Sequence, residues 1–200
     1  GNMNTTGRRV VMVTVGLALL SAGSADAFDG KRKGFVIGGG LGPAPVVRWE
    51  GPVLEYNPVG MTWSRVRVDD SKFGVGAQLL VGYAWDEANM IVVEGNAAAM
   101  QSDILFDEPA VSQGFGGISW YHYFGEVGRT VFSAVGIGSY AFQIEDEEAA
   151  ESEFGMLVGG GYEFSPHWQV GGYLTFGDTS DPLGDNDHVT FSVLIGAVAF

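Results

Sequence analysis

The sequence predicts an all-β fold, a closed antiparallel transmembrane β-barrel of eight strands, and three observations support this prediction. Apolar residues alternate with small or polar residues along several segments, the two-residue period of a strand with one face in lipid. Aromatic residues end these segments about 36 to 40 residues apart, at Trp85, Phe124 and Phe164, each followed by a short turn, and at the last residue, Phe200. This interval fits two membrane strands of about ten residues each with their connections. Finally, 32 glycines interrupt the apolar segments and disfavour helices.

The amino-terminal residues predict export through a membrane. Arg8 and Arg9 precede a short apolar run, and an Ala-Asp-Ala pattern that a signal peptidase would cut ends at Ala27. We therefore assign residues 1–27, which include two residues ahead of the first methionine, to a cleaved signal peptide. Residues 28–200 are assigned to one mature barrel domain. The sequence contains no cysteine, so thiol chemistry and thiolate metal sites are excluded.

Alternation is strictest in three of the predicted strands. In residues 73–85 the larger apolar side chains share one face and glycines dominate the other, and residues 154–164 and 168–176 repeat this pattern. Residues 130–142 are apolar on both faces, and in residues 188–200 the face from Val189 to Ile195 suits lipid better than the face that contains Phe200, so the inward parity of both strands stays open. The remaining predicted strands cover residues 34–42, 90–101 and 113–124.

The connections are predicted to alternate in length, as in membrane barrels whose short turns face the periplasm. Pro43 and Pro45 should end the first strand, because proline interrupts a strand ladder. Residues 62–68 alternate again, which predicts a hairpin extension above the membrane, with a barrel of ten strands as the alternative. The predicted short turns are residues 86–89, 125–128 and 165–167, and the longer acidic loops are residues 102–112, 143–152 and 177–187.

Large aromatic residues gather at the predicted short-turn end of the strands. Aromatic side chains concentrate at membrane surfaces, so these residues are expected to form an interfacial girdle. A soluble barrel of lipocalin type would also alternate, but it would gain nothing from aromatic residues at one rim. The girdle candidates are Tyr83, Trp85, Phe124, Tyr162, Phe164, Trp168 and Phe200.

These features resemble the small bacterial outer-membrane barrels, the OmpA, OmpX and OmpW-like group. The resemblance rests on the signal peptide, the opening strand from Gly34 to Gly42, the turn-ending aromatics and Phe200. It implies an outer-membrane location in a Gram-negative envelope and recognition by the barrel-assembly machinery, through apolar residues spaced two apart from Phe200. Members of the group usually carry an aromatic residue where this sequence has Val198.

A few polar residues share the parity of the barrel interior. Glu94, Asn96 and Glu163 have the parity opposite to the apolar residues of their strands, so we expect them to point inward. A carboxylate that faced lipid would be destabilising. Arg129 is the only Lys or Arg between residues 73 and 200, so we predict that it pairs with Glu163 at the periplasmic mouth. Glu94 would then depend on polar neighbours or a proton. Other expected interior residues are Gln78, Gln169, Tyr173 and Thr175.

The sequence predicts no catalytic residue and no cofactor. Gly136 to Ala141 matches a dinucleotide fingerprint, but no helix pattern follows to bind a pyrophosphate. His188 and Thr190 share a face with the His-x-Ser spacing of outer-membrane lipid A deacylases. Thr replaces the nucleophilic Ser, and no carboxylate follows to orient the histidine. A lipid-modifying enzyme is therefore the least favoured of three functional hypotheses.

Charge limits the partners. The net charge of −14 makes free nucleic acid an unfavourable partner. Divalent cations could bridge the acidic loops to the phosphates of lipopolysaccharide, and a solvated surface is the alternative interpretation. Arg48, Arg65 and Arg67 could bind the same phosphates directly. The candidate metal ligands are Asp178, Asp181, Asp185 and Asp187.

The leading functional hypothesis is a non-enzymatic outer-membrane protein with a structural or surface-interaction role through its acidic extracellular loops. It follows from the fold, because side chains rather than water fill the interior of an eight-stranded barrel. A narrow, porin-like conduit for small or apolar molecules is the second hypothesis.

Overall fold

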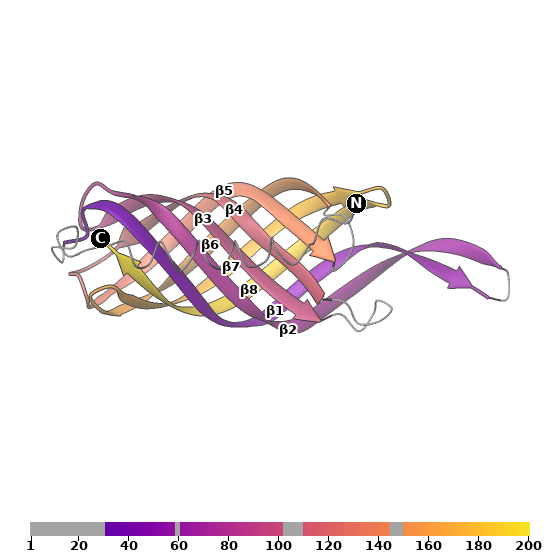
Figure 1. The fold of residues 1–200 in the computed structure, drawn as a ribbon, viewed down its shortest axis with the longest axis horizontal. Coiled ribbons are helices and arrows are strands. Elements are labelled where there is room, and N and C mark those ends of the chain that lie inside the picture. The colour runs from indigo at the N-terminus through magenta and orange to yellow at the C-terminus, as the bar shows by residue number, and fades with distance from the viewer. Residues whose placement is uncertain (1–30, 59–60, 102–109, 145–149) are drawn as a thin grey trace, which may run out of the picture.

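The computed structural model describes residues 31–58, 61–101, 110–144 and 150–200, which form one closed antiparallel barrel (Figure 1). Each strand pairs with its sequence neighbours, and β1 closes against β8. The predicted eight-stranded barrel is therefore confirmed, and the ten-stranded alternative is wrong. No helix in these ranges is long and apolar enough to cross a membrane. The predicted signal peptide, residues 1–27, lies outside them. The strands are β1 (Gly34–Asn57), β2 (Thr62–Ala84), β3 (Asn89–Gln101), β4 (Ala110–Tyr123), β5 (Thr130–Ile144), β6 (Glu151–Ser165), β7 (Trp168–Asp181) and β8 (Gly184–Ala199).

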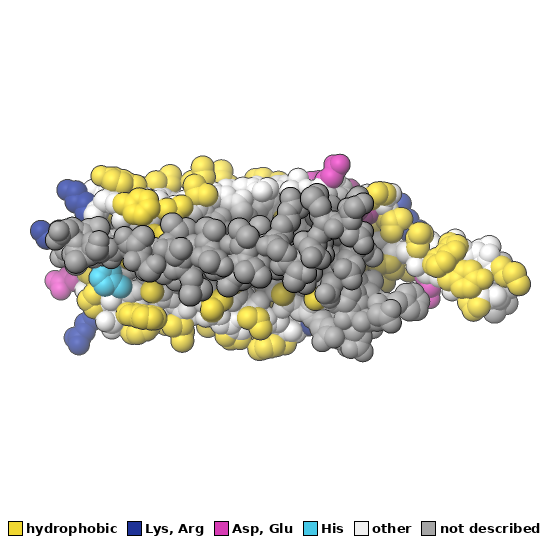
Figure 2. Space-filling view, viewed as in Figure 1, with side chains coloured by type: hydrophobic (Ala, Val, Ile, Leu, Met, Phe, Trp, Pro, Cys, Tyr) yellow, Lys and Arg dark blue, Asp and Glu magenta, His cyan; other side chains and the backbone are white. Residues whose placement is uncertain are grey.

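Alternation along the strands sorts side chains between the outer surface and the interior. In β2, Phe73, Leu79 and Tyr83 are exposed on the outside, whereas Gln78 and Leu80 are buried inside. The predicted parities of β6 and β7 are confirmed in the same way. Figure 2 shows apolar side chains along the outer surface of the barrel.

Packed side chains fill the interior in two apolar clusters. The larger cluster contains Tyr121, Phe132 and Tyr173 among others, and the smaller one, toward the β1–β2 hairpin, is built around Trp49 and Phe142. Tyr173 also shows why the inner faces are rich in glycine. A Cβ atom at Gly159 or Gly171 would lie 2.5 or 2.8 Å from the Tyr173 ring, so the ring fits in the interior only because these two positions carry no side chain.

The predicted short turns are confirmed, and they lie together at one end of the barrel. Residues 85–88, 124–129 and 166–167 join β2 to β3, β4 to β5 and β6 to β7. The aromatic residues next to these turns, Trp85, Phe124 and Phe164, are exposed on the outside of the barrel. Phe200 differs from them, because it is 1% exposed and packs inside the mouth. The parity of β8 explains this difference, because Leu194 and Val198 are buried on the same face while Phe191 and Ile195 point outward.

The first two strands extend well beyond the others. The predicted hairpin extension is confirmed, and Figure 1 shows it projecting from the end opposite the short turns. The prediction that Pro43 and Pro45 end the first strand is wrong. A β-bulge between Ala44 and Val47 interrupts the pairing with β2, and a matching irregularity lies opposite β8, so both prolines sit where a ladder hydrogen bond is already missing.

The prediction of a long loop over residues 177–187 is also wrong. Strands β7 and β8 continue through it, with Asp178 opposite Asp187, and residues 182–183 form the turn. The Asp181 carboxylate fixes this turn by accepting the N–H groups of Leu183 and Gly184, at 2.7 and 3.0 Å. The other two predicted loops fall largely on residues 102–109 and 145–149, outside the described ranges.

Candidate functional site

Arg32 closes the short-turn end of the interior. It precedes β1, but its side chain is fully buried, and its guanidinium forms an ion pair with Glu163 of β6. The same guanidinium donates a hydrogen bond to the Glu87 carbonyl in the turn between β2 and β3. Its Cζ atom lies 3.4 Å from the centroid of the Tyr123 ring and 5.5 Å from that of Phe200, which is a cation–π geometry. One arginine therefore joins elements from around the whole mouth.

Glu163 has a second partner in the turn between β4 and β5. Its Oε1 atom accepts the backbone N–H of Gly128 at 2.7 Å. Gly128 has a φ of +88°, and a Cβ atom there would approach Pro166 Cδ to 2.8 Å, so glycine is the residue that presents this N–H without strain. The buried carboxylate is thus held by a charge and by main chain.

The predicted pairing of Glu163 with Arg129 is wrong, and Arg129 is not an interior residue. Its side chain is exposed, and the inward position next to it is taken by Thr130, which lies opposite Glu163 in the register. Nothing in the strand pattern marks Arg32, since it lies ahead of the first alternating segment. The one usable signal was that Glu163 needed a cation and that few were available.

Glu94 occupies the middle of the interior without a cationic partner among the described residues. Its Oε2 atom accepts hydrogen bonds from Gln78 Nε2 at 2.5 Å and from the Tyr121 hydroxyl at 2.9 Å. This confirms that Glu94 lies inward among polar neighbours. Asn96, two residues further along β3 on the same face, is fully buried, also as predicted. The remaining predicted interior residues, Gln169, Tyr173 and Thr175, are buried as well.

A second polar network lies nearer the hairpin end. Gln113 donates to Thr190 Oγ1 at 2.8 Å, and its Oε1 atom lies 3.0 Å from His188 Nδ1. His188 Nε2 lies 2.8 Å from Thr179 Oγ1, so both ring nitrogens are occupied by neutral groups. The Thr190 hydroxyl is bonded to Gln113 and Tyr140 rather than to His188. The His188 and Thr190 pair is therefore not assembled as a base and nucleophile.

Ion pairs on the outer face fix the base of the hairpin. Arg48 pairs with Asp69 at 2.8 Å and with Glu50 at 3.2 Å, while Arg67 pairs with Glu50 at 2.7 Å and with Asp187 of β8. We call these five residues the rim ladder. Hydrogen bonds from Arg48 and its positive charge lower the pKa of Asp69 despite partial desolvation.

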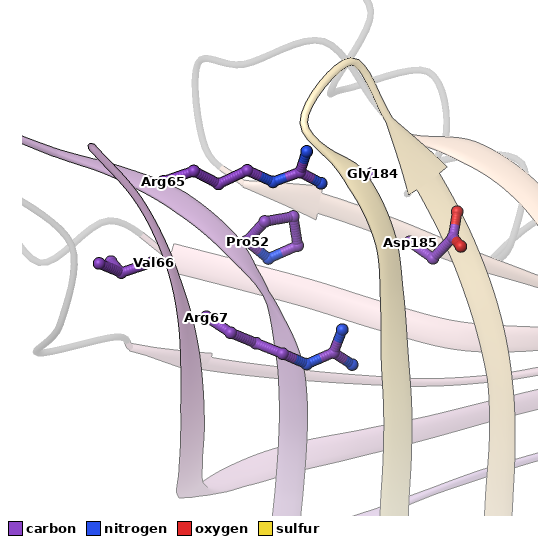
Figure 3. Close-up of a pocket in the computed structure, with 6 residues that line it drawn as sticks. All are labelled: Pro52, Arg65, Val66, Arg67, Gly184 and Asp185. Atoms are coloured by element: carbon purple, nitrogen blue, oxygen red, sulfur yellow. The ribbon is translucent and has the colours of Figure 1, made fainter. Parts of the chain in front are cut away.

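A cleft of about 400 Å³ lies above the rim ladder, where β1 separates from the turn between β7 and β8. Figure 3 shows the Arg65 and Arg67 side chains on either side of Pro52, both directed toward the hairpin that carries Gly184 and Asp185. In the described part of the chain, Arg65 has no ion-pair or hydrogen-bond partner, unlike Arg67.

The candidate metal ligands do not come together as one site. Asp181 is engaged in its own turn and Asp187 accepts Arg67. Partial burial and the neighbouring Asp187 raise the pKa of Asp178, a sign of carboxylate crowding. Across the described ranges, no group of three or more His, Asp or Glu side chains is placed to hold a metal ion.

Six of the seven girdle candidates are exposed on the outer surface at or near the short-turn end, and their role at a membrane interface stays a prediction. The seventh, Phe200, is inside and packs against Arg32, so it is not a girdle residue. The six exposed residues are Tyr83, Trp85, Phe124, Tyr162, Phe164 and Trp168.

No protein-family model matches this sequence, and no curated protein matches it. Among solved structures, Neisserial surface protein A is similar with a TM-score of 0.53 at 9% identity, over 82% of this chain and 96% of that one. Two others are the outer membrane protein OprG from Pseudomonas aeruginosa (TM-score 0.48, 13% identity, 84% and 96% covered) and Ail of Yersinia pestis (0.47, 12%, 83% and 99%). The fold is therefore that of the small outer-membrane barrels predicted by resemblance, and at these identities the likeness extends to the fold alone.

Proposed function

We propose that this protein is an integral outer-membrane barrel with a closed interior, which acts at the cell surface and is neither an enzyme nor an open pore. The apolar outer surface of the strands supports the membrane location, because a soluble barrel would expose polar residues there. The amino-terminal signal sequence supports export, and the barrel-assembly machinery and lipopolysaccharide are the expected partners in that membrane.

The filled interior carries the proposal. From Arg32 and Phe200 at one mouth, through Glu94 and Tyr173, to Trp49 at the other end, side chains with almost no exposed surface occupy the lumen. A water-filled path would leave these polar groups exposed. This favours a role at the cell surface over the conduit hypothesis, since the exposed side chains of the described residues lie on the outside of the barrel rather than along its interior.

Planar-bilayer recording tests closure. The refolded full chain should give no discrete current steps under conditions in which a general porin, reconstituted in parallel, does. Regular steps that persist in several preparations would replace the proposal with the conduit hypothesis.

Protease treatment of intact cells tests orientation. Arg65 and Arg67 are exposed on the hairpin, so trypsin should cut there from outside, and an Arg65→Gln, Arg67→Gln variant should resist. Cleavage only after the outer membrane is permeabilised would place the hairpin in the periplasm and contradict the proposal.

We also propose that divalent cations bridge carboxylates of residues 143–152 and 177–187, the predicted acidic loops, to lipopolysaccharide phosphates. Chelation should weaken retention of lipopolysaccharide by the purified barrel without unfolding it, because the strand ladders do not depend on the rim.

A further inference from the structure

Glu94 is a buried carboxylate that no cationic side chain of the described chain neutralises. It is 3% exposed and points into the middle of the barrel from β3. Glu163, by contrast, pairs with Arg32 at the mouth. The only Lys or Arg between residues 73 and 200 is Arg129, and its side chain is exposed. Because buried charges in proteins are paired or coordinate metal ions, Glu94 needs a positive charge from another source.

Only one of the two Glu94 oxygens has hydrogen-bond donors. Oε2 accepts both the Gln78 amide and the Tyr121 hydroxyl, and these two donors hold the carboxylate in a fixed orientation. Oε1 is buried and has no hydrogen-bond partner among the described residues. The lone pairs of Oε1 are therefore available to a further ligand inside the barrel.

Two neighbours of Glu94 carry buried polar atoms that also lack partners in the described chain. Asn96 lies two residues further along β3 on the same face, and neither atom of its amide is hydrogen-bonded. Ser119 lies on the adjacent strand β4 (Figure 1), diagonally across from Glu94, whose partner in the register is Gly117. Its hydroxyl is buried and unpartnered as well. Folded proteins leave few such atoms unsatisfied, so this group around a carboxylate indicates a bound ion or water.

Two glycines keep this part of the wall free of other side chains. A Cβ atom at Gly136 of β5 would lie 2.1 Å from Ser119 Oγ, so a larger residue there would displace the hydroxyl. A Cβ atom at Gly117, directly opposite Glu94, would lie 2.6 Å from the Phe115 ring. The positions that adjoin Glu94 and Ser119 therefore contribute backbone alone.

We propose that Glu94 Oε1, the Asn96 amide oxygen and the Ser119 hydroxyl bind one alkali cation, Na⁺ or K⁺, in the middle of the barrel. Carboxylate, amide and hydroxyl oxygens are ligands that suit hard cations. A single positive charge balances the single carboxylate, whereas a divalent ion would leave an excess charge buried. Because side chains close both ends of the lumen, the ion is bound as the barrel folds, and its binding stabilises the folded state.

Urea titration of the refolded full chain in lipid tests the proposal. N-methyl-D-glucamine chloride is replaced stepwise by NaCl or KCl at constant ionic strength, so that general screening does not change. The free energy of unfolding should rise toward a slope of about 1.4 kcal/mol per tenfold increase in the alkali ion, the linkage expected for one bound ion. Glu94→Gln should abolish this slope. Glu126→Gln, the same change at an exposed turn position, should retain it.

Asn96→Leu separates a ligand from an unsatisfied amide, because leucine keeps the approximate volume and removes both polar atoms. If Asn96 binds the ion, this variant should reduce the dependence on alkali ion and be less stable than the wild type in NaCl or KCl. If Asn96 binds nothing, the loss of two buried unpartnered atoms should stabilise the barrel in every salt. Ser119→Ala should shift the onset of stabilisation to higher ion concentration. These two variants leave the carboxylate in place, so they test the site even if Glu94→Gln does not refold.

Three results would overturn the inference. The first is equal stability of the wild type in alkali and N-methyl-D-glucamine chloride, which would leave only water at the site. The second is an alkali-ion slope that Glu94→Gln retains. The third is an infrared band of a protonated carboxylic acid that disappears in Glu94→Gln, which would show that a proton neutralises Glu94. None of these results bears on the closed barrel or its role at the cell surface, which the current recordings and protease treatment test separately.

Discussion

The two ends of the barrel use arginine–carboxylate pairs in opposite ways. At the short-turn end, Arg32 and Glu163 are sealed among Tyr123, Phe200 and main chain. At the hairpin end, Arg48 and Arg67 meet their carboxylates on the solvated outer face. The first arrangement closes a lumen, and the second orders a surface while leaving it open to partners.

Burial sets the energetic difference between the two ends. Two charges removed from water depend on each other, so loss of one leaves the other without compensation. Exposed pairs gain little, because water and salt already screen each charge. Substitutions at the short-turn end should therefore destabilise the fold, and those at the rim should change local electrostatics.

The largest effect is expected for Arg32→Met. It leaves Glu163 as an uncompensated buried charge and should lower the free energy of unfolding by about 3–5 kcal/mol, measured by urea titration of the refolded barrel in lipid. Arg32→Met combined with Glu163→Gln should recover much of the loss. Arg129→Met, at an exposed position, should change stability by no more than about 0.5 kcal/mol. Equal effects of Arg32→Met and Arg129→Met would show that the mouth is not held by Arg32.

An intermediate effect is expected at Glu94, inside the barrel but away from any arginine in the described chain. Glu94→Ala removes the acceptor of Gln78 and Tyr121 and should cost about 1–3 kcal/mol. Glu94→Gln keeps an acceptor oxygen without the charge and should cost clearly less in the same titration. Equal losses for Glu94→Gln and Glu94→Ala would mean that a neutral acceptor cannot replace the carboxylate in this network.

The smallest effect is expected at Asp69, on the rim. Its pKa in the folded chain is below the usual value of about 3.9, so pairing with Arg48 contributes fully above that value and is lost as pH falls through the folded pKa. NMR titration of the Asp69 carboxyl should show this low pKa, and Arg48→Gln should return it toward normal. High salt should have the same direction of effect. If neither Arg48→Gln nor high salt changes the pKa of Asp69, Arg48 is not the cause of the lowered pKa.

The strand pattern was predictable because it is local. Lipid on one side and a narrow lumen on the other impose a period of two, so the eight strands, the short turns and the inward positions of Glu94, Asn96 and Glu163 follow from residue order. Where alternation was ambiguous, in β5 and β8, the sequence left parity open, and packing against neighbouring strands decided it.

Other features depended on contacts between distant segments. Asp178 and Asp187 look like loop residues until they pair across β7 and β8, and Pro43 and Pro45 look like strand ends until the bulge accommodates them. In each case local propensity was overruled by a partner strand that the residue order does not reveal.

The sequence by itself determined the fold class and, in most strands, the separation of lipid-facing from interior residues, because each follows from alternation within a strand. Only the tertiary structure placed Arg32 against Glu163, turned Phe200 inward and raised Trp63 and Arg65 above the rim ladder. Closing a barrel brings residues from both ends of the chain into contact, and no periodicity within one segment encodes which of them meet.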